Sequence, residues 1–506
     1  MLYVRFTKTK SKATAVQVVK YVKRKTVILK HIGSSKKTDE IKRLKTVATR
    51  WIEQYNPQLC LFSQNSGDLE DSPKVVVLNK VKLISTHSLF VYEVLSQVSR
   101  YLGFYKLLTD NPKREILLDL VVTRLIHPAS KLESIQFLKE EFGIKYERSS
   151  VQRSLAQWSL LKDQVEEIIV NFAKKQLDFT FKVIFYDVTT LYFESFKSDE
   201  ELKQCGFSKD NKFNQPQIVI GLVVNNQGFP ISYQVFAGNK FEGHTFIPIL
   251  ENLQQRYKIK TLTVVADAAM ISQKNVDELV TKKLHYIVGA RVSNLPHKII
   301  DIVYKGLNRQ DQATTRIKTS EGNLICSFLQ KRYRKDKHET EKQIARAEKA
   351  IQNPQGSIKR LKFVTTIKTK SSLNQKLIEK TKKLWGIKGY YTNLNSVSNL
   401  EIINQYRQLW KVEKSFRITK SDLQARPIYH RNTETIKSHI LICFMALSLA
   451  KYMEIRSGLS LKKTLKILKS VKDAKMKNTL TNEVWVMRTD PSKDVDNLLK
   501  KLNLSY

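Results

Sequence analysis

The sequence predicts a multidomain α/β protein, and three observations lead to this prediction. The chain has 506 residues, which is more than one hydrophobic core usually organises. Apolar residues recur at helical spacing in some stretches, whereas other stretches are dense in β-branched and aromatic residues. The 88 Lys and Arg residues exceed the 47 Asp and Glu residues, and the formal charge of +41 goes beyond what solubility requires. The expected partner is therefore a polyanion.

The positive charge is spread along the chain. Residues 1–38 contain eleven Lys or Arg residues and no acidic residue, and basic clusters recur at Lys331–Lys337 and Lys380–Lys383. A footprint this wide suits an extended duplex better than a small anionic ligand. We therefore expect double-stranded DNA as the partner.

The cysteines and the apolar runs exclude several other classes of protein. The four cysteines stand far apart without a CxxC pair, which argues against a zinc ribbon and against a disulfide framework. The longest apolar run, Ile440–Ala450, is shorter than the roughly 20 residues that span a bilayer, so it predicts a buried helix. No uninterrupted apolar segment follows the charged N-terminus, as a secretory signal would require. We expect a cytoplasmic protein that associates with the nucleoid through DNA and has no membrane partner. The cysteines are Cys60, Cys205, Cys326 and Cys443.

The first predicted domain, residues 1–80, is small and basic. It mixes short β-like runs at Ala15–Val22, Val27–Leu29 and Val75–Leu78 with a helix-like stretch at Glu40–Tyr55. These elements predict an α+β domain. The Gly33–Thr38 segment hints at a phosphate loop but lacks its second glycine.

The next domain, residues 81–178, is predicted to be helical and to bind DNA. Apolar residues recur there at helical spacing, as at Ile116, Leu117 and Leu120, with few strand signals. The Ser154–Lys162 segment fits a helix-turn-helix, and a packed helical bundle explains it equally well.

A layered α/β core follows. Its pattern gives three strands and then alternating helices and strands, an order found in ribonuclease H-like domains. The predicted elements are, in order, strands Val183–Phe193, Ile218–Val224 and Phe229–Phe236, helix Thr245–Arg256, strand Leu262–Ala266, helix Ser272–Lys283 and strand His285–Gly289.

The second half of the chain predicts an interruption of this core. An irregular stretch with β-like pieces surrounds a charged helix at Arg334–Ile351, after which helical periodicity resumes from Asn399. The end of the chain is basic and mostly helical in pattern. The predicted boundaries are 179–292 for the first part of the core, 293–392 for an inserted subdomain, 393–456 for the second part of the core and 457–506 for the tail.

Three carboxylates in this core are candidates for metal-dependent chemistry. Asp187 sits inside an otherwise apolar strand, where a charge is costly unless a cation or another partner neutralises it. Asp267 follows an apolar strand at its carboxyl end, and Glu413 lies on a predicted helix, Gln405–Thr419. Carboxylates of this kind can hold two divalent ions that serve phosphodiester cleavage. An all-oxygen set suits Mg²⁺, with Mn²⁺ as a substitute.

Each carboxylate also has an ordinary structural explanation. A strand aspartate is often a turn or salt-bridge residue, and Glu413 could pair with Arg407 or Arg417. Glu194, Glu242 and Asp422 lie near the candidates in the sequence, and Glu242 is the main competitor. His244, His285 and His439 lack metal-ligand spacing and are predicted to be structural.

Four stretches make the sequence resemble a known family. The chain resembles the DDE transposases of bacterial insertion sequences, in the IS-four superfamily and particularly its sixteen-thirty-four-like group, over roughly residues 180–455. The most specific stretch is Gly206–Thr245, and VIFYDVTTLYFES and VVADAAMIS look like the strands of the first and second aspartates. YRQLWKVEKSFRITKSDLQARPIYH looks like the helix that brings the glutamate. The resemblance implies that Asp187, Asp267 and Glu413 are the catalytic metal ligands.

The family signature of Tyr, Arg, Glu and Lys fits with one departure. It falls on Tyr406, Leu409, Glu413 and Lys420, so the arginine position holds a leucine. The resemblance implies that Tyr406 and Lys420 contact the phosphate next to the cleaved DNA end; otherwise they are an amphipathic tyrosine and a solvated lysine. Arg407 and Arg417 lie nearby as further DNA-binding candidates without the family spacing. A second departure is Ala269, where the family commonly has glycine.

The resemblance also implies a function. Such a protein binds terminal inverted repeats, cuts DNA with metal ions, joins the freed end to target DNA, and works as a homodimer. An inactive DNA-binding remnant and a nuclease of the same fold remain as alternatives. Because Asp267 and Glu413 are 146 positions apart, residues 293–389 are expected outside the catalytic layer. Trp385 or Trp410 could hold a flipped base, although both are more readily explained as core residues.

Overall fold

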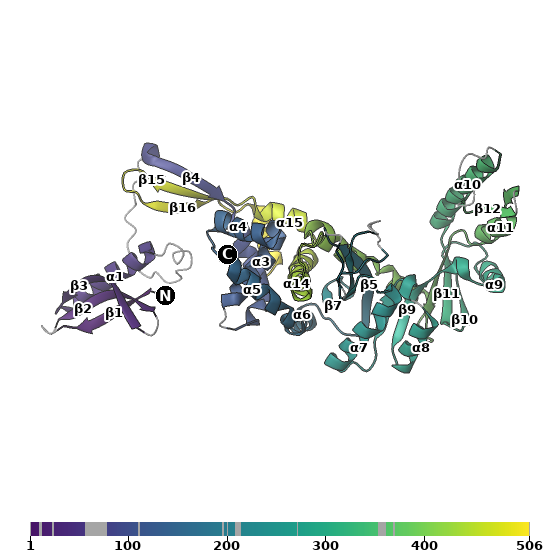
Figure 1. The fold of residues 1–506 in the computed structure, drawn as a ribbon, viewed down its shortest axis with the longest axis horizontal. Helices are drawn as coiled ribbons and strands as arrows, with labels where there is room; N and C mark the ends of the chain where they lie inside the picture. The colour runs from purple at the N-terminus through teal and green to yellow at the C-terminus, as the bar shows by residue number, and fades with distance from the viewer. Residues whose placement is uncertain are drawn as a thin grey trace. The chain divides into compact units, whose positions relative to one another are not determined.

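The computed structural model describes most of the chain in two compact units, Met1–Lys80 and Val81–Tyr506 (Figure 1). The described residues are 2–9, 13–22, 25–55, 78–109, 112–194, 197–199, 201–207, 214–270, 272–352, 361–367 and 370–504. Cys60 and residues 75–77 of the strand predicted at Val75–Leu78 lie outside these ranges.

The first unit is an antiparallel sheet with one helix. The strands pair in the order β1-β2-β3, and helix α1 packs against all three. Val16, Val18 and Ala48 are buried between the sheet and the helix, because apolar residues alternate along the strands and repeat along α1. The strand and the helix predicted at Ala15–Val22 and Glu40–Tyr55 are both confirmed. The elements are β1 (Leu2–Lys8), β2 (Thr14–Val22), β3 (Lys25–Ser35) and α1 (Thr38–Tyr55).

The second unit begins with a short strand and a layer of helices. The predicted helical character of this region is confirmed, and the Ser154–Lys162 segment spans the end of α5 and the start of α6. Its Leu155, Trp158 and Leu161 side chains are buried, as a packed bundle requires. The elements are β4 (Val81–His87), α2 (Leu89–Leu102), α3 (Pro112–Ile126), α4 (Lys131–Phe142), α5 (Arg148–Trp158) and α6 (Lys162–Gln176).

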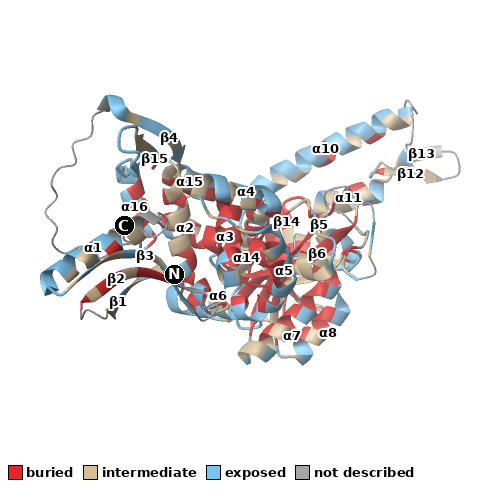
Figure 2. Cartoon of the chain, turned by 60° about the vertical axis from the view of Figure 1, so that its left-hand side comes forward, coloured by how far each residue is buried: buried red, intermediate tan, exposed pale blue. Residues whose placement is uncertain are grey.

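The long apolar helix α14 (Thr433–Ser457) forms the centre of this layer. It packs against α2, α3, α5 and α6, and it also contacts the main sheet. Among the described helices it is the one long and apolar enough to cross a membrane, yet 89% of its most apolar window is buried inside the protein. The buried helix predicted at Ile440–Ala450 is therefore confirmed. Figure 2 shows the buried residues concentrated in α3, α14 and the main sheet.

An eight-stranded mixed sheet forms the largest element of the second unit. Its order is β10-β11-β14-β9-β8-β5-β6-β7, in which β5, β8 and β9 run parallel and the other neighbours are antiparallel. The predicted succession of three strands, helix, strand, helix and strand is confirmed. These elements are β5 (Val183–Tyr192), β6 (Gln217–Val224), β7 (Pro230–Ala237), α7 (Phe246–Tyr257), β8 (Thr263–Ala266), α8 (Gln273–Thr281) and β9 (His285–Ala290).

The central strands are continuous apolar runs in the sequence because both faces of the sheet are buried there. Every residue of β6 is buried. A close approach occurs at Gly221, where an added Cβ would lie 2.5 Å from the Tyr186 hydroxyl of β5. That hydroxyl donates to Thr245 Oγ1 at 2.7 Å, so the glycine makes room for a buried hydrogen bond.

The segment predicted as an inserted subdomain contributes three strands to the main sheet. β11 pairs with β10 on one side and with β14 on the other, and β14 pairs with β9. The expectation that residues 293–389 lie outside the sheet is therefore wrong for these strands. The physical reason is burial: residues 324–328 of β11 are all buried against the sheet core. The elements are α9 (His297–Leu307), β10 (Thr314–Thr319), β11 (Gly322–Phe328) and β14 (Ile387–Thr392).

The rest of that segment has a small core of its own. Ala347, Phe363 and Ile378 form a separate hydrophobic cluster between the long helix and its neighbours. The charged helix predicted at Arg334–Ile351 is confirmed, and Figure 2 shows it as a mostly exposed helix. The elements are α10 (Gln330–Gln352), β12 (Val364–Ile367), β13 (Lys370–Leu373) and α11 (Gln375–Lys383).

The C-terminal tail differs from its mostly helical prediction. Two of its four elements are strands, and β15 pairs with β4 from the start of the second unit (Figure 1). Arg488 anchors this sheet, because its guanidinium donates to Asp473 at 2.6 Å and to Glu93 of α2 at 2.7 Å. The elements are α15 (Leu461–Leu468), β15 (Asp473–Asn478), β16 (Val484–Arg488) and α16 (Lys493–Lys501).

Candidate active site

Asp187 and Asp267 lie at the same level of two neighbouring parallel strands. Tyr186 of β5 is the register partner of Ala266, the last residue of β8, so Asp187 within β5 and Asp267 directly after β8 occupy the next position. Each carboxylate accepts, through Oδ1, a hydrogen bond of 2.7 Å from the backbone N–H of the residue that follows it. The two side chains are therefore held in the same local way. Asp187 is half-buried and Asp267 is exposed.

Glu413 comes from a helix that crosses this part of the sheet. The single helix predicted at Gln405–Thr419 is wrong: α12 (Asn399–Arg407) ends before α13 (Trp410–Arg417) begins. Tight i→i−3 hydrogen bonds, such as Leu409 N–H to Tyr406 O at 3.0 Å, join the two helices. α12 packs on β8 and β9, whereas α13 packs on β5 and β6. The two helices thus pass over the strands that carry the aspartates.

Val412 and Phe416 hold α13 against the sheet and leave Glu413 outside. Both apolar side chains are buried, and Glu413 is exposed on the same short helix. This is the amphipathic spacing expected of a helix with one packed face. The sequence therefore presents Glu413 on the solvent side of the helix that covers β5.

Asp267 and Glu413 both affect the pKa values of Tyr406 and Lys388. Burial raises the pKa of Tyr406, and the charges of Asp267 and Glu413 raise it further. Burial lowers the pKa of Lys388, and Arg332 lowers it further, while Asp267 and Glu413 oppose this shift. Because both carboxylates act on the same tyrosine and lysine, they lie within electrostatic reach of one site.

Tyr406 is packed directly behind Asp267. Its hydroxyl donates to Asp267 Oδ1 at 3.4 Å, and its ring centroid is 4.7 Å from that of Tyr390. Gly289 makes room for it, since an added Cβ would lie 2.6 Å from the hydroxyl oxygen. Tyr406 is therefore buried and helps to orient the Asp267 carboxylate. Its contact with a DNA phosphate stays a prediction.

The other residues of the predicted signature occupy different environments. Arg407 and Arg417 are exposed at the ends of α12 and α13, and Lys420 is half-buried in the π-helix Ile418–Asp422 that follows. Leu409, which takes the arginine position of the signature, is buried in the main core. It therefore supplies packing at the junction of the two helices and no cationic contact. The DNA contacts of the three basic residues stay predictions.

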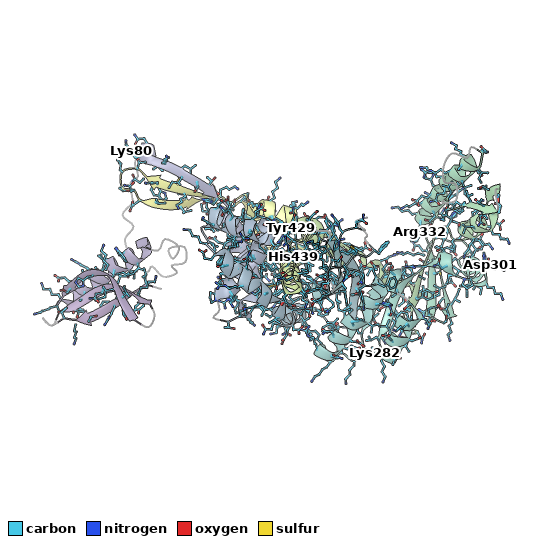
Figure 3. All side chains as sticks on the ribbon, viewed as in Figure 1. Lys80, Lys282, Asp301, Arg332, Tyr429 and His439 are labelled. Carbon is cyan, nitrogen blue, oxygen red and sulfur yellow. The ribbon has the colours of Figure 1, made fainter. Side chains whose placement is uncertain are left out.

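Lys388 and Arg332 are site residues that sequence reasoning missed. Lys388 lies on β14, with its ammonium 4.9 Å from the centre of the Tyr406 ring. Arg332, labelled in Figure 3, lies in the first turn of α10 and acts electrostatically on Lys388. A signal for Lys388 was present, because it is a charge within an otherwise uncharged strand, as Asp187 is. It was missed because this segment was expected outside the sheet.

Glu242 lies near the first aspartate, as a competitor should. Burial raises the pKa of Tyr186, and the charges of Asp187 and Glu242 both raise it further. Asp422 is occupied elsewhere, in an ion pair of 3.4 Å with Lys462. His439 is buried, with Nε2 3.0 Å from the Ala425 carbonyl oxygen, in agreement with a structural role.

The two tryptophans proposed as base-holding residues differ. Trp385 is buried and its indole N–H donates to Thr340 Oγ1 at 3.0 Å, so it is a core residue as expected. The expectation of a core position is wrong for Trp410, which is 51% exposed on α13, three residues before Glu413. Its exposure follows from its position on the face of α13 opposite Val412 and Phe416.

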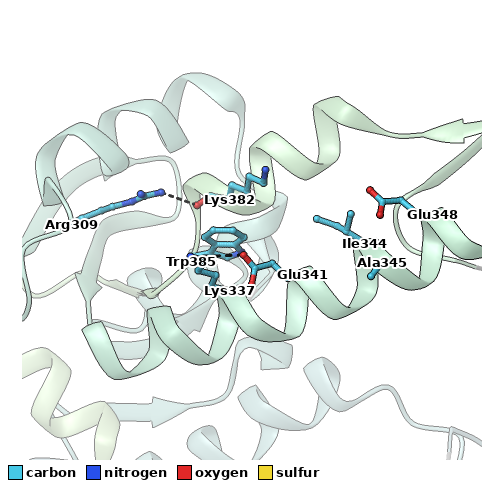
Figure 4. A pocket seen from close by; sticks show the side chains of 8 residues that line it. All are labelled: Arg309, Lys337, Glu341, Ile344, Ala345, Glu348, Lys382 and Trp385. Carbon is cyan, nitrogen blue, oxygen red and sulfur yellow. Dashed lines mark hydrogen bonds and ion pairs between the residues drawn. The ribbon is translucent and has the colours of Figure 1, made fainter.

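A cavity of about 490 Å³ lies between α10 and α11, away from the carboxylates (Figure 4). Its lining carries both signs of charge, from Arg309, Lys337 and Lys382 and from Glu341 and Glu348. None of the candidate catalytic residues lines it. The middle of β5 and the end of β8, where Asp187 and Asp267 lie, and not this cavity, are therefore the candidate active site.

The donor set at this surface fits a hard divalent cation. Three carboxylates offer only oxygen ligands, which Mg²⁺ and Mn²⁺ prefer. Within the described residues, no three His, Cys, Asp or Glu side chains converge closely enough to hold an ion by themselves. Glu413 is on a short helix joined to α12 by a tight turn, so its carboxylate is the member of the set least fixed by the strands.

The sequence matches a family model described as the transposase DDE domain over residues 179–449, more than half of the chain. The protein therefore belongs to the transposase DDE domain family. The match includes Asp187, Asp267 and Glu413. Membership implies DNA cleavage and transposition, and members of this family generally use divalent metal ions.

Comparison with solved structures returned other transposases. A piggyBac transposase synaptic complex with hairpin DNA matches at 10% identity and a TM-score of 0.36, over 76% of this chain and 79% of that chain. A Mos1 transposase paired-end complex with the left transposon end matches at 12% identity and a TM-score of 0.16, over 48% of this chain and 66% of that chain. The Mos1 strand transfer complex matches at 13% identity and a TM-score of 0.16, over 48% and 65%. A search of curated proteins found no match.

Proposed function

We propose that this protein is the transposase of a bacterial insertion sequence, of the sixteen-thirty-four-like group of the IS-four superfamily. In this proposal Asp187, Asp267 and Glu413 are its catalytic residues. One observation carries the proposal: the two aspartates stand side by side on parallel strands, inside the stretch that matches the transposase DDE domain. A helix carrying the third carboxylate passes over the same strands.

The catalytic core is proposed to be ribonuclease H-like. The order β7-β6-β5-β8-β9 supports this, because three antiparallel strands are followed by two parallel strands reached through helices. Open α/β sheets bind ligands beyond the carboxyl ends of their parallel strands, where Asp267 follows β8. β10, β11 and β14 then extend the sheet on the side of β9.

The chain's own residues take distinct parts in the proposed chemistry. Asp187, Asp267 and Glu413 would hold two divalent ions, Mg²⁺ or Mn²⁺. When bound, such ions activate the attacking oxygen and stabilise the leaving oxygen of a phosphodiester. Tyr406 orients Asp267 by donating to its Oδ1. The Lys388 ammonium lies 4.9 Å from the centre of the Tyr406 ring and within electrostatic reach of Asp267 and Glu413, so it can bind a DNA phosphate at this site.

The proposed substrates are the terminal inverted repeats of the element and a target duplex. A charge of +41 supports binding to DNA backbones, and the exposed Arg407 and Arg417 lie on the helices that cover the site. Both ends of the element must be held before either is joined, so the active form is proposed to be a homodimer. The protein would act on nucleoid DNA in the cytoplasm.

A cleavage and joining assay tests this function. The wild-type protein is incubated with Mg²⁺, a labelled duplex carrying the DNA that flanks its coding sequence, and a supercoiled target plasmid. We expect nicks at the repeat boundary and labelled joints in the plasmid, both requiring the metal ion. Nicks without joints would indicate a nuclease of the same fold. Specific binding without nicks would indicate an inactive DNA-binding remnant. The control omits the metal ion and adds a chelator.

A further inference from the structure

We propose that the face of the β1–β3 sheet opposite α1 docks into the major groove of duplex DNA and reads base edges with Arg5, Gln17 and His31. This inference rests on the proposed function in one respect, because it takes DNA as the substrate. It goes beyond that function by naming the surface that recognises sequence. The surface belongs entirely to the first unit.

The strand register places three polar side chains in one row across the sheet. Arg5 of β1 is the partner of Gln17 of β2, and Gln17 is the partner of His31 of β3. Cross-strand partners point to the same face, and neighbouring residues along a strand alternate between the faces. Val4 and Val18 belong to the core under α1, so the row of Arg5, Gln17 and His31 lies on the opposite face.

A second row on this face is apolar. Tyr3, Val19 and Ile28 are partners across the three strands. Tyr3 and Ile28 are 41% and 52% exposed, although they flank the buried Val19. An exposed aromatic and aliphatic row beside a polar row offers apolar contact with thymine methyl groups as well as hydrogen bonds.

The charges of the unit point to a polyanionic partner on this face. Arg5 and His31 are exposed, Gln17 is half-buried, and none of the three makes a hydrogen bond or ion pair with another described side chain. In the described part of the unit, every acidic residue lies on α1, which covers the other face. Among the residues that the structure describes in this unit, no acidic side chain neutralises the row of donors.

The dimensions and chemistry fit the major groove of duplex DNA. That groove is about 12 Å wide, and neighbouring strands lie about 4.8 Å apart, so the outer two of three strands are about 10 Å apart. Arginine pairs with guanine and glutamine with adenine through two hydrogen bonds each. An acidic protein would satisfy the charge of Arg5 but not the spacing of Arg5, Gln17 and His31 along one row.

Selection of binding sites from a pool of random-sequence duplexes tests the inference. The full-length wild type, Arg5→Ala, Gln17→Ala and Lys42→Ala are compared. Lys42 is exposed on α1, so its variant removes one cation from the other face. We expect the wild type to enrich one motif, and Arg5→Ala and Gln17→Ala each to lose preference at different positions of it. Each of these two should bind the wild-type motif about tenfold to a hundredfold more weakly. Lys42→Ala should keep the motif.

Two results would overturn the inference. One is the same motif from all four proteins, which would place the reading surface elsewhere. The other is failure of the wild type to enrich any motif. Far-ultraviolet circular dichroism establishes that the variants keep the fold. Catalysis is scored separately, with Asp187→Asn in the same selection: that variant should keep the motif and lose nicking. If the wild type enriches a motif that depends on Arg5 but does not nick DNA, the proposed reading surface stands and the proposed catalytic function is rejected.

Discussion

Asp187→Asn is expected to lower the rate of metal-dependent nicking by at least about a thousandfold. Asparagine keeps the shape of the side chain and can still accept from the Val188 N–H, but it carries no negative charge. A neutral amide binds a hard divalent cation poorly, so the loss falls on chemistry and not on folding. The measurement is the initial rate of nicking of the repeat-bearing duplex at saturating Mg²⁺.

Two further carboxylate variants test whether the loss of nicking is specific to Asp187. Asp277→Asn on α8 is the matched control, because Asp277 is exposed and its carboxylate accepts from Gln273 at 2.8 Å. It should leave the nicking rate within about twofold. Glu242→Gln tests the competitor that shares the surroundings of Tyr186 with Asp187. If Glu242→Gln were inactive and Asp187→Asn active, the assignment of the first ligand would have to be moved to Glu242.

Glu166→Ala is expected to destabilise the second unit by about 3–5 kcal/mol. The Glu166 side chain is fully buried, where its Oε1 accepts from Ser232 Oγ at 2.9 Å and from the Tyr233 N–H at 3.1 Å. It also pairs with Lys162 at 3.0 Å and with Arg256. One carboxylate thus ties α6 to β7 and α7. Its removal takes the buried acceptor from the Ser232 hydroxyl and the Tyr233 N–H, which costs more than the lost bonds alone, while Arg256 and Lys162 keep Asp163 as a second partner.

The measurement is the urea midpoint of unfolding, with two comparison variants. Glu166→Gln keeps an acceptor for Ser232 and Tyr233 but loses the charge opposite Arg256, so its midpoint should fall between those of wild type and Glu166→Ala. Glu251→Ala is the surface control, because Glu251 pairs with Lys282 at 2.7 Å and its side chain is 42% exposed. It should change stability by less than about 1 kcal/mol. Equal midpoints for Glu166→Ala and Glu251→Ala would show that the buried network is not a stabilising link.

The central strands could be predicted from sequence because their signal is local. β5, β6 and β8 are short runs of β-branched and aromatic residues, and their burial on both faces makes those runs continuous. The same local contrast singled out Asp187 and Asp267, since a carboxylate within or directly after an apolar strand stands out. The order of strands and helices then followed from the order of the runs.

Pairings between distant segments could not be predicted in this way. β4 and β15 pair although His87 and Asp473 are separated by most of the second unit. β11 and β14 pair in the main sheet although α10 separates them in the sequence. Nothing in the local sequence of either strand indicates which strand it pairs with. Tertiary burial decides which distant strands pair. A local sequence pattern can therefore predict a strand without predicting the sheet to which it belongs.

The features of the candidate site that could not be predicted from the sequence also depend on contacts and hydrogen bonds that leave no local pattern. Lys388 and Arg332 come from the segment that was expected outside the sheet, and only the pairing of β14 with β9 brings Lys388 to Tyr406. The break between α12 and α13 was missed because Gln408 and Leu409 keep helical dihedral angles, and only the hydrogen-bond pattern tightens there. A helical pattern continues through such a turn in the sequence.

The location of a bound metal ion tests the central claim most directly. Crystals of the wild-type protein with its repeat duplex, soaked in Mn²⁺, would be measured at the manganese absorption edge. We expect an anomalous peak within about 2.0–2.3 Å of carboxylate oxygens of both Asp187 and Asp267, and its loss in Asp187→Asn. A peak bound by other carboxylates, with none between these two aspartates, would contradict the assignment of the active site.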